Sequence, residues 1–243
     1  MKTPHRNKIL VVLPAFNEEG KIGQVVRKVR EIDLVDSIVV ADDCSTDGTY
    51  DEASRAGAVV IRHEKNMGVG AGIRSGIRYG RRHDFDICLI LSGDDQHDPR
   101  EIERVAGPIL NDEYDFIQGS RWMDGGRVVN ERLFRKYTTR WYALFFTLLT
   151  GRRITDATNG FRGFRLSIFD HPDINLDQPW LDRYELEPYI LFKAVKNSKI
   201  RLKEVPITII YHRHRKQFTK MKPIRDWWRL ARPILYLALG LRK

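Results

Sequence analysis

The sequence is poor in cysteine and has no long apolar run. Its two cysteines, Cys44 and Cys88, end separate predicted strands and match no metal-binding spacing, so a reduced, cytosolic setting is favoured over a disulfide framework. The apolar segments 141–149 and 234–241 are far shorter than the roughly 20 residues that a transmembrane helix needs. Residues 1–8 are polar and lead directly into a predicted strand, so we expect no signal peptide.

Acidic residues are outnumbered by basic ones. The chain has 243 residues, and 42 Lys and Arg against 32 Asp and Glu give a net charge of +10. Such an excess is typical of proteins that bind nucleic acid, anionic membranes or phosphate-bearing substrates. We favour the last two, because no nucleic-acid recognition module is present.

The densest basic cluster covers residues 211–222. Its two histidines, His212 and His214, have no third ligand at a zinc-binding spacing. A basic loop that closes over a diphosphate is therefore favoured, with a solvated charged tail as the alternative.

Strand and helix patterns alternate through the first half. Short connections join strands at 9–13, 37–41, 58–62, 87–91 and 115–120 with helices at 22–32, 47–56 and 69–80. This alternation predicts an α/β fold with a mostly parallel, Rossmann-like sheet flanked by helices. In the second half we expect helices at 131–150 and 184–196, a short strand within 155–165, and a strand pair, 200–205 and 207–211. We predict one domain over 1–222 and an amphipathic C-terminal extension over 223–243.

The stretch 91–99 is the centre of this pattern. A buried strand ends there in Ser92-Gly93-Asp94-Asp95-Gln96, and Asp98-Pro99 starts a helix. Ligands bind at the carboxyl edge of such sheets. Hard oxygen ligands such as Asp94 and Gln96 suit a divalent cation that also bridges phosphates, Mg²⁺ or Mn²⁺.

Polar groups also follow the first two strands. Asn17 and Glu18 come after Pro14, where a capped helix start is the alternative reading. Asp42 and Asp43 point to opposite faces if the strand continues, so only one can enter a shared cleft. An acidic residue there can accept from a nucleobase or a ribose hydroxyl, although a simple turn is also compatible.

Glycine recurs every four residues at 68, 72, 76 and 80. This spacing clears one helix face for close packing, which we favour over a phosphate-binding loop.

Two later segments carry arginine. Arg121 precedes a glycine pair and is placed to meet an anion, or lies in a surface turn. Asp156 is a candidate base or leaving-group organiser. Alternatively, it pairs structurally with Arg162 or Arg165, which share a face only in a helix.

In combination, these motifs resemble one family. They are Pro-Ala-Phe-Asn-Glu-Glu (14–19), Asp-Asp-Cys-Ser-Thr-Asp-Gly-Thr (42–49), the glycine-rich helix, Ser-Gly-Asp-Asp-Gln-His-Asp-Pro (92–99), Gly-Ser-Arg-Trp (119–122), Asp-Ala-Thr-Asn-Gly-Phe-Arg (156–162) and Thr-Lys-Met (219–221). The chain resembles inverting GT-A glycosyltransferases of the polyprenyl-phosphate type, such as dolichyl-phosphate mannose synthase, over residues 9–228.

The resemblance implies a role for each matching position. The nucleotide pocket would be lined by Pro14, Phe16 and Glu18, with Asp43 on the base and Asp94 and Gln96 on the metal. The acceptor phosphate would be faced by Arg121 and Arg162, and the basic loop would act through Arg215, with Arg213 as a rival, and Lys220. Many relatives have an acidic residue where this chain has Ser92, so metal binding would depend more strongly on Asp94.

The predicted reaction is inverting transfer of a sugar to dolichyl or another polyprenyl phosphate at the cytoplasmic membrane face. GDP-mannose is the favoured donor, with UDP-glucose and UDP-N-acetylglucosamine as alternatives. Segments 141–149 and 227–241 combine aromatics, leucines and flanking arginines and are expected to lie on the membrane, or to form core or homodimer contacts. The alternative functions are a GT-A glycosyltransferase with a soluble or glycolipid acceptor and a non-catalytic nucleotide-sugar-binding protein.

Overall fold

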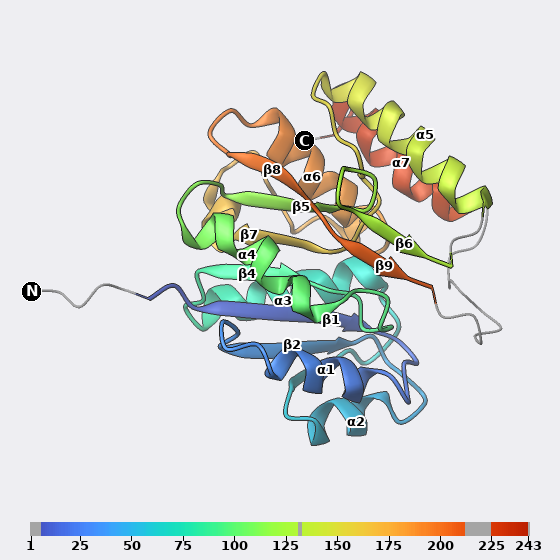
Figure 1. Ribbon diagram of the computed structural model, residues 1–243. Coiled ribbons are helices and arrows are strands. Elements are labelled where there is room, and N and C mark those ends of the chain that lie inside the picture. The colour runs from blue at the N-terminus through green and yellow to red at the C-terminus, as the bar shows by residue number, and fades with distance from the viewer. Residues whose placement is uncertain (1–5, 131–132, 212–224, 243) are drawn as a thin grey trace, which may run out of the picture.

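The computed structural model describes residues 6–130, 133–211 and 225–242. Its main feature is a seven-stranded sheet in the order β3-β2-β1-β4-β7-β5-β8 (Figure 1). The strands are β1 (Ile9–Ala15), β2 (Ser37–Asp42), β3 (Val59–Arg62), β4 (Ile87–Ile90), β5 (Phe116–Ser120), β7 (Arg162–Arg165) and β8 (Leu202–Pro206). All pairings are parallel except those of β7, which runs antiparallel between β4 and β5.

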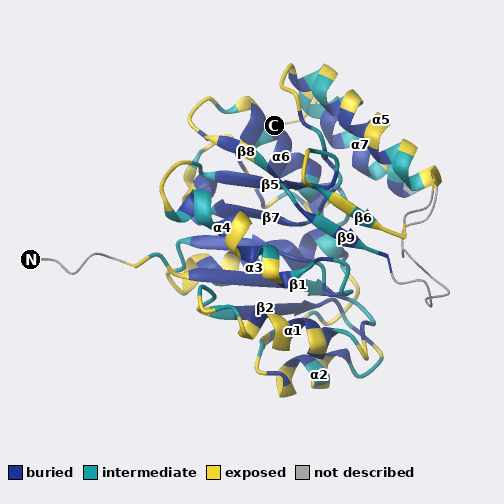
Figure 2. Ribbon diagram, in the orientation of Figure 1, coloured by how far each residue is buried: buried dark blue, intermediate teal, exposed yellow. Residues whose placement is uncertain are grey.

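Helices cover both faces of the sheet. One face packs against α1 (Ile22–Arg30), α2 (Thr49–Arg55) and α4 (Ile102–Leu110), and the other against α3 (Val69–Arg82), α5 (Leu133–Thr150), α6 (Leu186–Lys196) and α7 (Arg225–Ala238). Short 3₁₀ turns lie at Pro99–Glu101, Leu166–Asp170 and Pro179–Leu181. Alternate residues of β1 enter the two cores, so the strand is apolar throughout and buried, as Figure 2 shows. The predicted α/β architecture is confirmed.

The glycine spacing serves packing, as expected. A β-carbon at position 72 would lie 3.4 Å from that of Ala41 on β2, and one at Gly80 would lie 2.9 Å from Leu166. At Gly76 a β-carbon would overlap Val12 of β1. The bare face of α3 therefore lets the helix lie directly on β1 and β2, which fixes the position of its N-terminus at the carboxyl edge of the sheet.

The predicted strand pair near Pro206 is wrong. β8 pairs with β5, whereas β9 (Thr208–Ile210) pairs with β6 (Arg127–Val129) in a separate two-stranded sheet. Only Ile207 separates β8 from β9, and antiparallel strands need a longer turn to fold back on each other. The strand β6 had no clear signal in the sequence, since it is short and largely exposed.

The C-terminal helix α7 packs against α5 and α6. Leu230 and Ile234 are buried in this contact, and the Tyr142 hydroxyl of α5 donates to the Leu230 carbonyl at 2.6 Å. Within the described ranges, no helix is long and apolar enough to cross a membrane. The predicted boundary between domain and extension at residue 222 stays a prediction.

Candidate active site

The carboxyl ends of β1, β2, β4 and β5 meet at one edge of the sheet, together with the start of the antiparallel β7 (Figure 1). Because β1 lies between β2 and β4, the segments that follow these three strands are neighbours. This edge collects the predicted residues that the structure describes, which are Pro14, Phe16, Glu18, Asp43, Asp94, Gln96, Arg121, Asp156 and Arg162. Arg215 and Lys220, and their rival Arg213, lie outside the described residues.

Asp94 is held by a compact set of hydrogen bonds after β4. Its carboxylate accepts from the Ser92 hydroxyl at 2.6 Å, from the Gln96 side chain at 2.6 Å and from the Gln96 backbone N–H at 3.2 Å. Asp95 has a positive φ of 64° and pairs with Lys28 of α1 at 2.8 Å. The backbone thus directs Asp95 toward α1, and Asp94 remains the acidic residue grouped with Ser92 and Gln96.

The donor set at Asp94 limits the kind of metal that fits. In the described part of the chain, no group of three or more His, Cys, Asp or Glu side chains is placed to hold a metal ion. Asp94 and Gln96 offer one carboxylate and one amide oxygen. Mg²⁺ is commonly held by one or two carboxylates together with substrate phosphates and waters. Among the described residues, Asp94 and Gln96 therefore fit a divalent cation that is shared with a diphosphate.

His97 joins the Asp94 loop to the loop before β7. Its Nδ1 accepts from the Ser92 backbone N–H at 2.9 Å, so Nε2 carries the proton and donates to the Asn159 side-chain oxygen at 3.1 Å. Burial and the nearby Arg121 guanidinium lower the pKa of His97 to about 3. Both ring nitrogens are engaged, as expected for a residue that packs and orients the loop.

Asp43 at the end of β2 accepts three hydrogen bonds. The donors are the Met67 N–H at 2.8 Å, the Gly68 N–H at 2.7 Å and Nδ1 of His63 at 2.8 Å. Burial alone would raise the pKa of Asp43, but these three hydrogen bonds lower it overall. Asp43 thus fixes the loop between β3 and α3 as well as facing the sheet edge.

His63 is a site residue that the sequence reasoning missed. Its second nitrogen, Nε2, lies 3.0 Å from the Ser75 hydroxyl of α3. Asp42, the neighbour of Asp43, instead accepts from the Ser45 N–H at 3.0 Å and lies near Arg62. The two adjacent carboxylates therefore have separate environments, as the strand geometry predicts.

The segment after β1 lies beside the Asp94 loop at this edge of the sheet. The Glu18 N–H donates to the Thr49 hydroxyl at 2.7 Å, and the buried Glu18 carboxylate pairs with Lys21 at 2.5 Å. A β-carbon on Gly93 would lie 3.0 Å from the Pro14 carbonyl. The Asp94 loop and the segment containing Pro14 and Phe16 are consequently in close contact.

Arg121 and Asp156 form a buried ion pair. Arg121 Nε and Nη2 donate to the two carboxylate oxygens at 2.6 and 3.3 Å, and Nη1 donates to the Tyr211 hydroxyl at 3.0 Å. Asp156 is fully buried and Arg121 is 4% exposed. The predicted alternative partners of Asp156, Arg162 and Arg165, are wrong: Arg165 instead pairs with Asp112 and Asp115.

Arg162 is buried at the start of β7. It donates to the Glu187 carbonyl at 2.9 Å and to the Asn159 carbonyl at 2.6 Å, and it lies 3.3 Å from the Glu187 carboxylate. It therefore joins β7 to α6. Its predicted contact with an acceptor phosphate stays a prediction.

The comparisons identify the family. A family model described as glycosyl transferase family 2 matches residues 10–171. The chain belongs to this family. It is therefore a glycosyltransferase, as predicted.

Curated relatives agree with this assignment, and a solved structure shares the fold. The chain is 31% identical to a UDP-N-acetylglucosamine–dolichyl-phosphate N-acetylglucosaminyltransferase of Methanococcus voltae, over 84% of this chain and 86% of the relative. It is 27% identical to an undecaprenyl-phosphate mannosyltransferase of Micrococcus luteus, over 84% of each chain. Glucosyl-3-phosphoglycerate synthase of Mycobacterium tuberculosis, solved with Mg²⁺ and UDP, has the same fold, with a TM-score of 0.70 and 20% identity over 98% of this chain and 81% of that one.

Proposed function

We propose that the chain transfers a sugar, with inversion, from a nucleotide sugar to dolichyl or another polyprenyl phosphate. One observation carries the acceptor assignment. The Tyr211 hydroxyl accepts from Arg121, and the Arg135 guanidinium of α5 lies 4.9 Å from the centre of the Tyr211 ring. The buried Arg121 at the sheet edge is thus joined through Tyr211 to Arg135 of α5, a helix that exposes a row of apolar side chains. That arrangement suits an anionic head on an apolar chain, and two of the relatives described above are named for such acceptors.

The nucleotide would lie along the ends of β1 and β2. Pro14, Phe16 and Glu18 would line its pocket, and Asp43 would accept from the base. Asp94 and Gln96 would hold Mg²⁺ or Mn²⁺ against the diphosphate; when bound, the cation would offset the charge that develops on the leaving nucleoside diphosphate. Both GDP-mannose, the donor that we predict, and UDP-N-acetylglucosamine are compatible with these residues.

The protein needs to orient the acceptor phosphate, but it does not need a general base to activate it. A phosphate monoester has a second pKa of about 6, so at neutral pH it is largely a dianionic nucleophile. Asp156 is already bound to Arg121 and to the Thr158 hydroxyl, the latter at 3.1 Å. We therefore assign Asp156 the role of fixing Arg121, rather than of removing a proton. Arg121 and Arg162 would orient the acceptor, and Arg215 and Lys220 would close on the diphosphate.

At the membrane surface, α5 and α7 would contact the lipid. The exposed apolar residues of α5 form a row along the helix, with Trp141 68% and Leu148 73% exposed. Figure 2 shows these outer positions of α5 as exposed, on the side away from the sheet. The row consists of Leu133, Phe134, Tyr137, Trp141, Leu144 and Leu148. With neighbouring cations such as Arg140, this face suits peripheral attachment to the cytoplasmic side of an anionic membrane.

Transfer of labelled sugar tests the proposal. The protein is incubated with Mg²⁺ or Mn²⁺, dolichyl phosphate and, in turn, labelled GDP-mannose, UDP-glucose and UDP-N-acetylglucosamine. Label that becomes extractable into organic solvent with one donor supports the proposal and identifies the sugar. Label that appears only on a water-soluble acceptor supports the alternative acceptor class. Binding of the donor without any transfer supports the non-catalytic alternative.

A further inference from the structure

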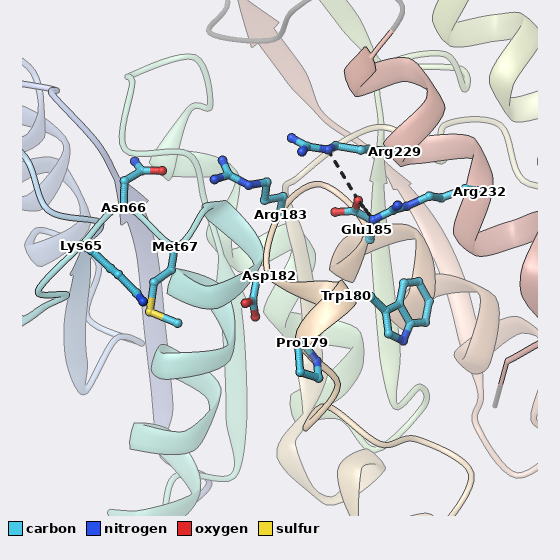
Figure 3. A pocket seen from close by; sticks show the side chains of 10 residues that line it. All are labelled: Lys65, Asn66, Met67, Pro179, Trp180, Asp182, Arg183, Glu185, Arg229 and Arg232. Carbon is cyan, nitrogen blue, oxygen red and sulfur yellow. Dashed lines mark hydrogen bonds and ion pairs between the residues drawn. The ribbon is translucent and has the colours of Figure 1, made fainter.

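A cavity of about 400 Å³ lies at the same sheet edge, beside the region assigned to the nucleotide. Its walls come from the loop before α3 and from the segment that precedes α6, together with α7 (Figure 3). Met67 lines this cavity and also donates its N–H to Asp43. A volume of this size is typical of small-ligand sites. The cavity is therefore a direct neighbour of the proposed donor site.

The cavity carries uncompensated positive charge. Its two acidic residues are already paired: Asp182 with Arg74, and Glu185 with both Arg229 and Arg232. The other two cations that line it, Lys65 and Arg183, have no ion pair within the described residues. Figure 3 shows Arg183 between the Lys65 loop and the wall that contains Arg229.

Arg183 is held in place by the backbone around it. The Asp182 carbonyl accepts from the Ala71 N–H at 2.8 Å, which seats this segment on the first turn of α3. A β-carbon on Gly68 would lie 2.6 Å from both the Arg183 side chain and the Asp182 carbonyl, so glycine is required for this approach. The backbone of Arg183 is thus fixed beside the N-terminus of the 14-residue helix α3.

Glu185 is a buried acidic residue in the wall of the cavity. It is 1% exposed, and its Oε2 has no hydrogen-bond partner among the described residues, while Oε1 faces Arg232. Two guanidinium groups already balance its charge. Glu185 therefore adds little net negative charge to the cavity, and the cationic character of Lys65 and Arg183 remains.

We propose that this cavity is an anion subsite for a substrate of the transfer reaction, with Arg183 and Lys65 as the cationic ligands of a phosphate or carboxylate group. The proposal rests on the proposed function, because it takes the substrates to be a nucleotide sugar and a polyprenyl phosphate. Three sources supply such a group: the donor diphosphate, a carboxylate on the transferred sugar, and the acceptor phosphate. Arginine recognises all three through paired N–H groups, and lysine acts as a point charge.

Calorimetric titration of Arg183→Gln and Lys65→Gln tests the subsite without turnover. The titrants are UDP and GDP, the pair UDP-glucose and UDP-glucuronate, and a short-chain polyprenyl phosphate. We expect each variant to weaken binding of one anion class by about 10- to 100-fold, as for the loss of a hydrogen bond to a charged group. Weaker binding of UDP or GDP identifies the diphosphate. A loss confined to UDP-glucuronate identifies an acidic sugar, and a loss confined to the lipid phosphate identifies the acceptor.

Arg81→Gln is the matched control, since Arg81 lies at the other end of α3 and pairs with Asp170 on the surface. It should bind every titrant as the unmodified protein does, and thermal melting of all three variants checks the fold. Affinities within twofold of the unmodified protein for every titrant, in both Arg183→Gln and Lys65→Gln, would overturn the subsite. Absence of sugar transfer with Arg183-dependent binding intact would instead count against the proposed function and leave the subsite standing.

Discussion

Nδ1 of His63 lies 2.8 Å from Oδ1 of Asp43, and the opposite ring nitrogen lies 3.0 Å from the Ser75 hydroxyl. The imidazole therefore fixes the carboxylate that we assign to the nucleobase, and it ties that carboxylate to α3. A residue between a binding group and a rigid helix contributes to affinity by holding the group in position.

We predict that His63→Leu weakens binding of the matching nucleoside diphosphate by about 10-fold, because Asp43 loses a hydrogen bond and its fixed orientation. His63→Asn should recover most of the affinity, since its side-chain N–H can take the place of Nδ1–H. Calorimetric titration with UDP and with GDP provides the measurement. Equal affinities in His63→Leu and the unmodified protein would show that His63 does not position Asp43.

Asp94→Ala should abolish nearly all transfer, by about 100-fold or more, because the grouped carboxylate at the end of β4 is lost. The fold should be retained, since Asp94 is a half-buried loop residue. Removal of divalent cations with a chelator should reduce transfer by the unmodified protein to a similar level. Asp95→Ala is the control, because Asp95 pairs with Lys28 on the α1 side. Substantial transfer by Asp94→Ala would exclude the metal assignment.

The sequence predicts the elements better than it predicts their pairing. Buried strands such as 37–41 are recognisable from their own apolar residues, and so is the glycine face of α3. The antiparallel insertion of β7 between β4 and β5 depends on residues more than 40 positions apart, and no local pattern encodes it.

In the candidate site, too, single residues can be predicted from the sequence but their contacts cannot. The positions of Asp43 and Asp94 follow from strand ends, but their partners do not. His63 contacts Asp43 from 20 residues away, and Ser75 contacts His63 from a separate element, 12 residues further along the chain. The guanidinium that pairs with Asp156 comes from Arg121, 35 residues earlier, although Arg162 and Arg165 are nearer in sequence. Tertiary packing decides these contacts.

Asp156→Ala should lower the free energy of unfolding by about 3–5 kcal/mol, because it leaves the Arg121 guanidinium buried without its counter-ion. Urea unfolding monitored by circular dichroism measures this loss. A catalytic base would behave differently, since its removal would slow transfer and leave stability nearly unchanged. Such a result for Asp156→Ala would contradict the positioning role that we assign to it.

Stability should fall in mild acid because of His97. The folded protein keeps this side chain neutral down to a pKa of about 3, whereas the unfolded chain takes up a proton near its ordinary pKa of 6.5. Between these values the unfolded state binds more protons, so lowering the pH favours unfolding by up to about 1.4 kcal/mol per pH unit. Urea unfolding of the metal-free protein from pH 7 to pH 5 measures the slope. His97→Asn should have a shallower slope, and identical slopes would rule out this contribution.

Membrane attachment should depend on the exposed row of α5. In the double variant Trp141→Gln, Leu148→Gln, binding to vesicles that contain anionic lipid should fall by about 10-fold or more, because two apolar side chains no longer leave water on binding. Vesicle flotation at low and at high salt measures both the apolar and the charge-dependent parts of the interaction. Tyr50→Gln is the control, since Tyr50 is 38% exposed on α2, on the far side of the molecule from α5 (Figure 1). If the double variant floats as the unmodified protein does, α5 is not the membrane-facing surface, and its apolar row is left as a contact for another protein surface.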